Sequence, residues 1–349
     1  MPTKEELKEL RSKSLAEKIQ ISTARIIEWY ENWGGQVYVS NSGGIDSCVL
    51  SDLVHKIYPE VPDVFVDTGL EYPELRDFIL NKPSVEVIKP KVSFKEILTK
   101  YGYPVISKKI SRDVGVAKHC PKGKTALRFD ENSEYSIKYG SRYSNAKWKF
   151  LIDAPFRTSD RCCLIMKKAS AKHYEKETGR YGYVGTMTEE SSQRETVWEK
   201  QGCNAFNAKR PISAPLSFWT KNDILEYVVK NNLPYASVYG DIVFQKGKYK
   251  TTGCQRTGCV WCAYGAQADK KENKFQRLAK THPQLWDYCM RGGKFDEEGM
   301  WIPDKGLGMA YVLDYINIKW WNDGDEEIRD KYRKEYTEKG ALICQQEKN

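Results

Sequence analysis

The sequence predicts an α/β protein, in which a parallel sheet carries helices on both faces, followed by a cysteine-bearing, mostly helical C-terminal region. The first observation is that short apolar segments at residues 36–40, 63–66, 85–88 and 181–186 alternate with segments of helical period. This alternation is typical of parallel strands joined by right-handed helical crossovers. The second observation is that the chain beyond the last cysteine cluster, from about residue 266, has mostly helical character.

The helices expected around these strands follow from caps and periodicity. Thr3 and Glu6 form a capping-box pattern that opens a long helix to about residue 33, and Gly34-Gly35 ends it. The further expected helices follow the Gly-rich turn after the first strand, cover residues 73–80, 94–101 and 158–178, and begin at Thr220. Between about residues 118 and 150 the alternation of strand and helix patterns is absent, which indicates an insertion or an irregular hairpin.

These elements suggest three parts of the chain. We expect an N-terminal helix at residues 1–33 and an α/β domain at 34–235 that contains a basic insertion at about 118–150. A cysteine loop, expected at residues 246–265, and further helices form the third part at 236–349.

Composition narrows the class of partner and the compartment. The chain has 349 residues and a net charge of +9, which favours an anionic partner such as a nucleotide or nucleic acid. Because the chain has no apolar run of 18 residues and no signal-peptide pattern at its start, we expect a cytoplasmic protein without membrane contact. In a reducing compartment, clustered cysteines more often bind metal or perform redox chemistry than form disulfides.

A Gly-rich loop follows the first expected strand and precedes a helix. Its residues are Ser42-Gly43-Gly44-Ile45-Asp46-Ser47. Two glycines let bare N–H groups approach an anion, and the helix start adds further donors. Ser42 and Ser47 can donate hydroxyl hydrogen bonds, and Asp46 can orient a divalent cation such as the Mg²⁺ of ATP. The alternative is an ordinary strand-to-helix turn with a polar cap.

Three motifs resemble one enzyme family. The loop resembles the pyrophosphate loop of the ATP-pyrophosphatase superfamily, and Asp67-Thr68-Gly69-Leu70-Glu71-Tyr72-Pro73-Glu74 resembles the phosphoadenosine-phosphosulfate (PAPS) reductase branch. A third motif after the strand at 181–186 matches that family at Gly185, Glu190, Ser191 and Arg194, whereas Met187 replaces an arginine. The resemblance implies a five-stranded adenine nucleotide α-hydrolase fold, which is Rossmann-like, with the nucleotide across the carboxyl ends of the strands.

The same resemblance implies roles for individual residues. Asp67, with Thr68 and Gly69, would lie in the nucleotide pocket near metal or ribose. Arg194 would clamp a phosphate, with a surface ion pair as the alternative. Asp46, Asp67 and Arg194 are therefore the candidate catalytic residues.

Five cysteines fall into two tight groups, Cys162-Cys163 and the C-x4-C-x2-C segment of Cys254, Cys259 and Cys262. A C-x2-C turn can present two thiolates to one metal centre. Resemblance to adenylylsulfate reductases implies a [4Fe–4S] cluster held by Cys162, Cys163, Cys259 and Cys262. Cys254 is a fifth candidate ligand, which could replace one of the adjacent pair and leave a thiol able to carry sulfur. Structural zinc and inert buried cysteines are the alternatives.

Three functions fit these motifs. The one we favour from sequence is ATP-dependent adenylation that releases pyrophosphate, followed by sulfur transfer from the cluster or a cysteine, because the loop is shaped for pyrophosphate. Its sulfur acceptor could be DNA or tRNA, since residues 135–150 combine Lys138, Arg142, Lys147 and Lys149 with aromatic residues. Its protein partner could be a cysteine desulfurase or a reductant protein. The second function is reduction of PAPS or adenylylsulfate to sulfite. Against this function, the sequence lacks the C-terminal Glu-Cys-Gly-Leu-His motif of such reductases. The last ten residues contain a single cysteine, Cys344. The third is non-catalytic sensing of nucleotide or redox state.

Overall fold

The computed structural model describes residues 2–140, 144–269 and 271–340, and the chain divides into two compact units. Unit 1 contains Met1–Pro90 and Lys167–Gly258, and unit 2 contains Lys91–Met166 and Cys259–Asn349. The expected boundaries at residues 33 and 235 do not coincide with the borders of these units. Each unit is thus built from two separate stretches of the chain.

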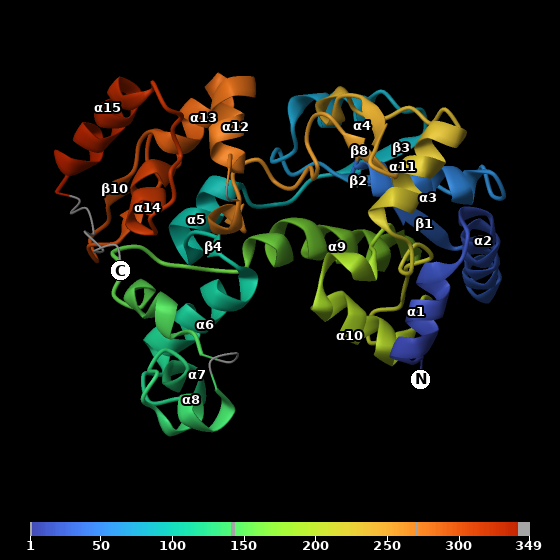
Figure 1. Ribbon diagram of the computed structural model, residues 1–349, viewed down its shortest axis with the longest axis horizontal. Helices are drawn as coiled ribbons and strands as arrows, with labels where there is room; N and C mark the ends of the chain where they lie inside the picture. Colours follow the sequence, from blue (N-terminus) through green and yellow to red (C-terminus); the bar gives the residue numbers. More distant parts are fainter. Residues whose placement is uncertain (1, 141–143, 270, 341–349) are drawn as a thin grey trace. The chain divides into compact units, whose positions relative to one another are not determined.

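Unit 1 is built around a parallel sheet, as the sequence predicts (Figure 1). Its strands pair in the order β3-β2-β1-β5-β6, and every pairing is parallel. The bounds of these strands, in chain order, are Val37–Ser40 (β1), Asp63–Val66 (β2), Val85–Ile88 (β3), Tyr181–Val184 (β5) and Ile212–Ser213 (β6). Because the strand order reverses at β1, the loops that follow β1 and β5 leave the sheet side by side at a topological switch point.

Helices cover both faces of this sheet, and each face has its own core. On one face, Tyr38 of β1 and Val64 of β2 pack with Tyr174 of a helix. On the other face, the hydroxyl of Tyr183 donates to the carbonyl of Ile26 at 2.7 Å. The helices of unit 1 are Lys4–Ser12 (α1), Leu15–Asn32 (α2), Ile45–His55 (α3), Pro73–Leu80 (α4), Ala169–Thr178 (α9), Ser192–Gln201 (α10) and Lys221–Lys230 (α11). Most residues of strands β1 and β2 are buried between the two layers of helices.

The expected single N-terminal helix is wrong, because the chain forms two helices, α1 and α2. Ser14 interrupts them: its side chain accepts from the amide of Glu17, and the Glu17 carboxylate accepts from the amide of Ser14. Lys13 is extended, with φ −66° and ψ 153°. A second capping box therefore overrides the continuous apolar period.

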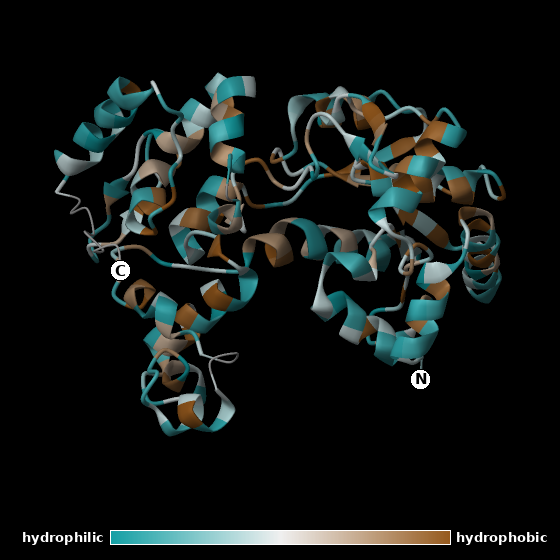
Figure 2. Cartoon of the chain, in the orientation of Figure 1, coloured by the Kyte–Doolittle hydropathy of each residue, from teal (hydrophilic) through white to brown (hydrophobic). Residues whose placement is uncertain are grey.

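Unit 2 is mainly helical. Its helices are Phe94–Tyr101 (α5), Lys108–His119 (α6), Lys124–Leu127 (α7), Glu134–Tyr139 (α8), Lys274–Thr281 (α12), Pro283–Met290 (α13), Met309–Tyr315 (α14) and Glu326–Thr337 (α15). Two short strands, Val105–Ile106 (β4) and Ala263–Tyr264 (β9), pair in parallel, and Lys294–Phe295 (β10) pairs with Trp301–Ile302 (β11). Helix α15 is mostly hydrophilic in Figure 2, and its buried residues are Tyr332 and Tyr336. Within the described ranges, no helix has the length and apolar character needed to cross a bilayer.

Two segments that were expected to be irregular contain regular structure instead. The described part of residues 118–150 forms α7, α8 and a 3-10 helix at Ala146–Leu151, held together by the buried Asp113, which accepts from Arg128 and Asn145 at 3.2 and 3.1 Å. The expected cysteine loop at 246–265 contains β9 and also Lys248–Thr251 (β8), which pairs with Ile242–Gln245 (β7). In the first segment, polar side chains hold the helices together, and in the second, strands pair as a hairpin. Neither feature produces a periodic pattern of apolar residues in the sequence.

Gly182 of β5 is expected to tolerate no side chain. A Cβ atom there would lie 3.0 Å from the Cζ and hydroxyl oxygen of the buried Tyr38 ring. Gly182→Ala should lower the free energy of unfolding by about 1–3 kcal/mol, because the ring must shift within a packed core. Denaturant titration measures this change. Gly115→Ala in α6 is the control, since a Cβ atom there would come no nearer than 3.6 Å to its neighbour, the carbonyl oxygen of Thr158. Equal midpoints for the two variants would contradict this expectation.

Candidate nucleotide loop and cysteine group

The Gly-rich loop lies at the switch point of the unit 1 sheet. It leaves β1 and runs into α3, whose first residue is Ile45. Gly185, which follows β5, packs against the same helix start, because a Cβ there would lie 3.0 Å from the Asp46 carbonyl oxygen and 3.1 Å from Ser47 Cα. Gly43 has φ +75°, where a side chain would also meet Leu75 at 3.0 Å. The structure thus brings the loop and Gly185 together, and the role of Gly185 toward a nucleotide stays a prediction.

Four consecutive amides of the loop already donate hydrogen bonds to side chains. The pairs are Ser42 to Ser47 Oγ (3.2 Å), Gly43 to Asn41 Oδ1 (3.0 Å), Gly44 to Ser42 Oγ (3.4 Å) and Ile45 to the Tyr239 hydroxyl (3.2 Å). These are the donors that an anion would need. An anion bound here would therefore replace hydroxyl and amide acceptors rather than fill an empty cradle.

A buried polar network fixes the shape of the loop. Asn41 Oδ1 accepts from the Gly43 amide and the Ser47 hydroxyl, both at 3.0 Å, while Asn41 Nδ2 donates to Asp63 Oδ2 at 3.1 Å. Asp63 is 1% exposed and forms an ion pair with Lys82. Sequence reasoning missed Asn41 and Asp63. Their available signal was a pair of polar side chains at the ends of two apolar strands.

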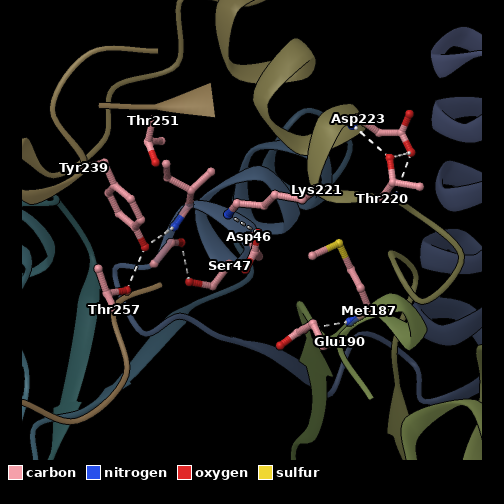
Figure 3. Close-up of polar contacts among 12 residues, drawn as sticks. Asp46, Ser47, Met187, Glu190, Thr220, Lys221, Asp223, Tyr239, Thr251 and Thr257 are labelled. Atoms are coloured by element: carbon pink, nitrogen blue, oxygen red, sulfur yellow. Dashed lines mark hydrogen bonds and ion pairs between the residues drawn. The ribbon is translucent and has the colours of Figure 1, made fainter. Parts of the chain in front are cut away.

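Asp46 faces Lys221, which sequence reasoning did not single out and which follows Thr220, the expected start of a helix. Lys221 Nζ, from the first turn of α11, lies 3.2 Å from Asp46 Oδ1 (Figure 3). The same ammonium group lies 5.9 Å from the centroid of the Tyr239 ring. Lys221 therefore places a positive charge beside the loop, where it can attract phosphate or sulfate. The proposed role of Asp46 in orienting a cation stays a prediction.

Asp67 lies after β2 and is neutralised by an arginine. Arg76 Nε and Nη2 donate to its two carboxylate oxygens at 3.0 and 2.8 Å. These hydrogen bonds hold the pKa of Asp67 below its ordinary value. Next to it, the Thr68 hydroxyl donates to Glu71 at 2.8 Å, and Gly69 has φ +68°. The roles of Asp67, Thr68 and Gly69 toward a nucleotide stay predictions.

Arg194 forms an ion pair with Glu190 inside its own segment. The Glu190 carboxylate also accepts from the Met187 amide at 3.3 Å (Figure 3). Met187 is buried, and its thioether has no N–H donor or charge with which to replace the contact of an arginine. A phosphate clamp by Arg194 would require it to leave Glu190, and this role stays a prediction.

Four of the five clustered cysteines belong to unit 2 and influence one another. Cys162 and Cys163 begin a helix that continues through a π-helical segment at Leu164–Lys168. The interaction with Cys163, then burial and the nearby Cys262 and Cys259 thiols, raises the pKa of Cys162. Burial, and then Cys259 and Cys163, raises the pKa of Cys262 to about 11. Two segments about a hundred residues apart therefore bring four thiols into one neighbourhood.

Among the residues that the structure describes, no group of three or more His, Cys, Asp or Glu side chains is placed to hold one metal ion. Cys254 belongs to unit 1, where its amide donates to Val238 O at 2.9 Å. Whether Cys254 is a ligand stays a prediction, and Cys344 lies outside the described residues.

The basic, aromatic stretch has local cation–ring contacts. Lys138 Nζ lies 5.5 Å from the Tyr139 ring centroid, and Lys147 Nζ lies 5.2 Å from that of Trp148. Arg142 lies outside the described residues. Each lysine therefore lies over an aromatic ring on which a nucleic-acid base would have to stack. A nucleic-acid partner stays a prediction.

Asn41→Ala should weaken nucleotide binding at the loop. Without the amide, the Gly43 N–H and the Ser47 hydroxyl lose the acceptor that orients them, so the affinity for ATP or adenylylsulfate should fall about tenfold. Isothermal titration measures the Kd. Asn231→Ala at the end of α11 removes a comparable amide away from the loop and should leave the Kd unchanged. An unchanged Kd in Asn41→Ala would refute the role of Asn41.

Comparison with known proteins supports the same family. The family described as "Phosphoadenosine phosphosulfate reductase domain" matches residues 36–109 and 124–264, more than half of the chain. An adenosine 5'-phosphosulfate reductase of Lysinibacillus sphaericus is 23% identical over 261 residues, covering 73% of this chain and 87% of that protein. That of Geobacillus kaustophilus is 25% identical over 232 residues, covering 66% and 76%. A solved PAPS reductase from Candida auris, a phosphate complex, has 17% identity and a TM-score of 0.35, covers 71% of this chain and 98% of that chain, and supports no conclusion. The chain therefore belongs to the PAPS reductase family of the adenine nucleotide α-hydrolase superfamily.

Proposed function

We propose that this protein is a sulfonucleotide reductase that converts adenylylsulfate or PAPS to sulfite. The observation that carries the proposal is that the family match spans both the Gly-rich loop and the segment with Cys254, Cys259 and Cys262. Relatives named adenosine 5'-phosphosulfate reductase align over about three quarters of the chain. Sequence reasoning placed this function second, and the comparisons favour it over ATP-dependent sulfur transfer.

The chemistry needs two thiols and an anion site. A thiolate attacks the sulfur atom of the sulfonucleotide, the bond from that sulfur to the phosphate oxygen breaks, and the nucleotide leaves with the electron pair. A second thiolate then attacks the sulfur of the modified cysteine and releases sulfite, so that two thiols become one disulfide. Cys254 and Cys344 are the candidate thiols outside the group in unit 2. The loop amides and Lys221 would hold the anionic end of the nucleotide.

The four thiols of unit 2 are candidate ligands of an iron–sulfur cluster. They lie close enough to influence one another electrostatically, and four cysteine thiolates are the usual ligand set of such a cluster. We propose Cys162, Cys163, Cys259 and Cys262 as ligands of a [4Fe–4S] cluster. When bound, the cluster supplies an iron centre whose potential depends on burial and hydrogen bonding. Because this chemistry needs reduced thiols, we propose a cytoplasmic location.

ATP-dependent sulfur transfer is the second candidate. The complete Ser-Gly-Gly-Ile-Asp-Ser loop and the ammonium group of Lys221 beside Asp46 favour a pyrophosphate group. Zinc instead of the cluster, a DNA or tRNA acceptor, a desulfurase partner and a purely sensory role rest on the sequence alone.

Product analysis separates the two functions. Protein purified without oxygen and supplied with a dithiol should release sulfite from adenylylsulfate or PAPS. Release should fall at least tenfold in Asn41→Ala and persist in Asn231→Ala, because only the first variant disturbs the loop. Pyrophosphate from ATP without sulfite from either sulfonucleotide would refute the reductase and support sulfur transfer.

Iron content identifies the cluster ligands. Cys162→Ser and Cys259→Ser should each lose most of the iron and acid-labile sulfide, because a serine hydroxyl is a poor ligand for iron in a cluster that favours thiolates. Cys254→Ser should keep the wild-type content, and Cys289→Ser is a matched control for a buried cysteine. Elemental analysis of protein purified without oxygen measures both. Zinc in place of iron, or loss of iron in Cys254→Ser alone, would contradict this ligand set.

A further inference from the structure

We infer that Tyr239 is a positioning residue that holds the segment at residues 253–257 against the nucleotide loop, so that an anion at the loop and this segment compete for one hydroxyl group. The inference rests on the proposed function in one respect, namely that the loop binds an anionic nucleotide. It concerns a residue that none of the three sequence motifs contains.

The Tyr239 hydroxyl bridges two parts of unit 1. It accepts from the amide of Ile45 at 3.2 Å, and it shares a hydrogen bond of 2.7 Å with Thr257 Oγ1 (Figure 3). Tyr239 is 3% exposed, so water cannot easily replace either partner. Burial raises the pKa of the Tyr239 phenol above its ordinary value, which keeps the hydroxyl neutral. One neutral hydroxyl thus links the start of α3 to the segment at residues 253–257, which contains Cys254.

The backbone next to Tyr239 holds the same segment. The Gly253 amide donates to Tyr239 O at 2.8 Å, and the Cys254 amide donates to Val238 O at 2.9 Å. The backbone segments at Val238 and Gly253 are in close contact, because a Cβ atom at Gly253 would lie 2.5 Å from the carbonyl oxygen of Val238. Tyr239 therefore contacts the segment through its main chain and its hydroxyl together, and a shift of Tyr239 must be felt at residues 253–257.

Anion binding would change this bridge. The Ile45 N–H is the first donor of α3, and a charged oxygen is a stronger acceptor for it than a neutral phenol. A hydroxyl has one proton. If the Tyr239 hydroxyl loses the Ile45 donor and donates its one hydrogen bond to the bound anion, it can only accept a hydrogen bond from Thr257. The direction or the length of the Tyr239–Thr257 bond must then change. Occupancy of the loop would reach the segment that contains Cys254.

Hydrogen exchange measured by mass spectrometry on the full chain tests this link, first without ligand. Tyr239→Phe keeps the ring and removes the bridge, so exchange in residues 251–258 should become about two- to tenfold faster, as expected for one lost hydrogen bond. Thr257→Val removes the same bond from its other end and should act alike. Tyr235→Phe is the matched control, since this ring lies beside Tyr239 and should leave exchange unchanged. Unchanged exchange in both Tyr239→Phe and Thr257→Val would overturn the inference.

The second arm adds inorganic pyrophosphate, or adenylylsulfate, with binding measured by titration. In the wild-type protein and in Tyr235→Phe, the ligand should alter exchange in residues 251–258. In Tyr239→Phe it should still bind and leave that exchange unaltered. An equal response in Tyr239→Phe would overturn the inference. If neither ligand binds the wild-type protein, the proposed function fails, while the ligand-free arm still decides whether Tyr239 holds the segment.

Discussion

The pairing of β1 with β2 on one side and with β5 on the other is the constraint on which the candidate nucleotide site depends. Because all three strands are parallel, the residues that follow them emerge at one edge of the sheet. Asn41, Asp67 and Gly185 come from three distant parts of the sequence, and this pairing alone places them at that edge. A shift of one residue in the register of β5 would move Gly185 away from the start of α3.

Charge at this edge is balanced before any nucleotide binds. Asp46 faces Lys221 and Asp67 faces Arg76, so each carboxylate has its own cation. A nucleotide brings several negative charges, and it would draw these cations away from their carboxylates. The pairs thus permit an exchange of partners.

The sequence predicted the sheet well because strands and their helices repeat in a simple order. The strands at 63–66 and 85–88 and the helices at 73–80 and 94–101 have the expected bounds. The break at Ser14 was missed, because the reciprocal hydrogen bonds of two side chains, Ser14 and Glu17, outweigh a continuous apolar period. The loop and Gly185 were found from motifs, whereas Lys221 and Tyr239 were not. Their sequence neighbours indicate only a helix cap and a turn, and tertiary contacts alone bring them to the loop.

Asn41 illustrates how narrowly the contacts at this edge of the sheet restrict the choice of side chain. The two ends of its amide face opposite requirements, since the oxygen accepts from the loop and the nitrogen donates to the buried Asp63. An aspartate has almost the same shape, but it would place two anions against each other in the interior, and a leucine of similar size would serve neither side. Similarity of size is therefore no guide to replacement at position 41, where the asymmetry of the carboxamide is what the fold requires.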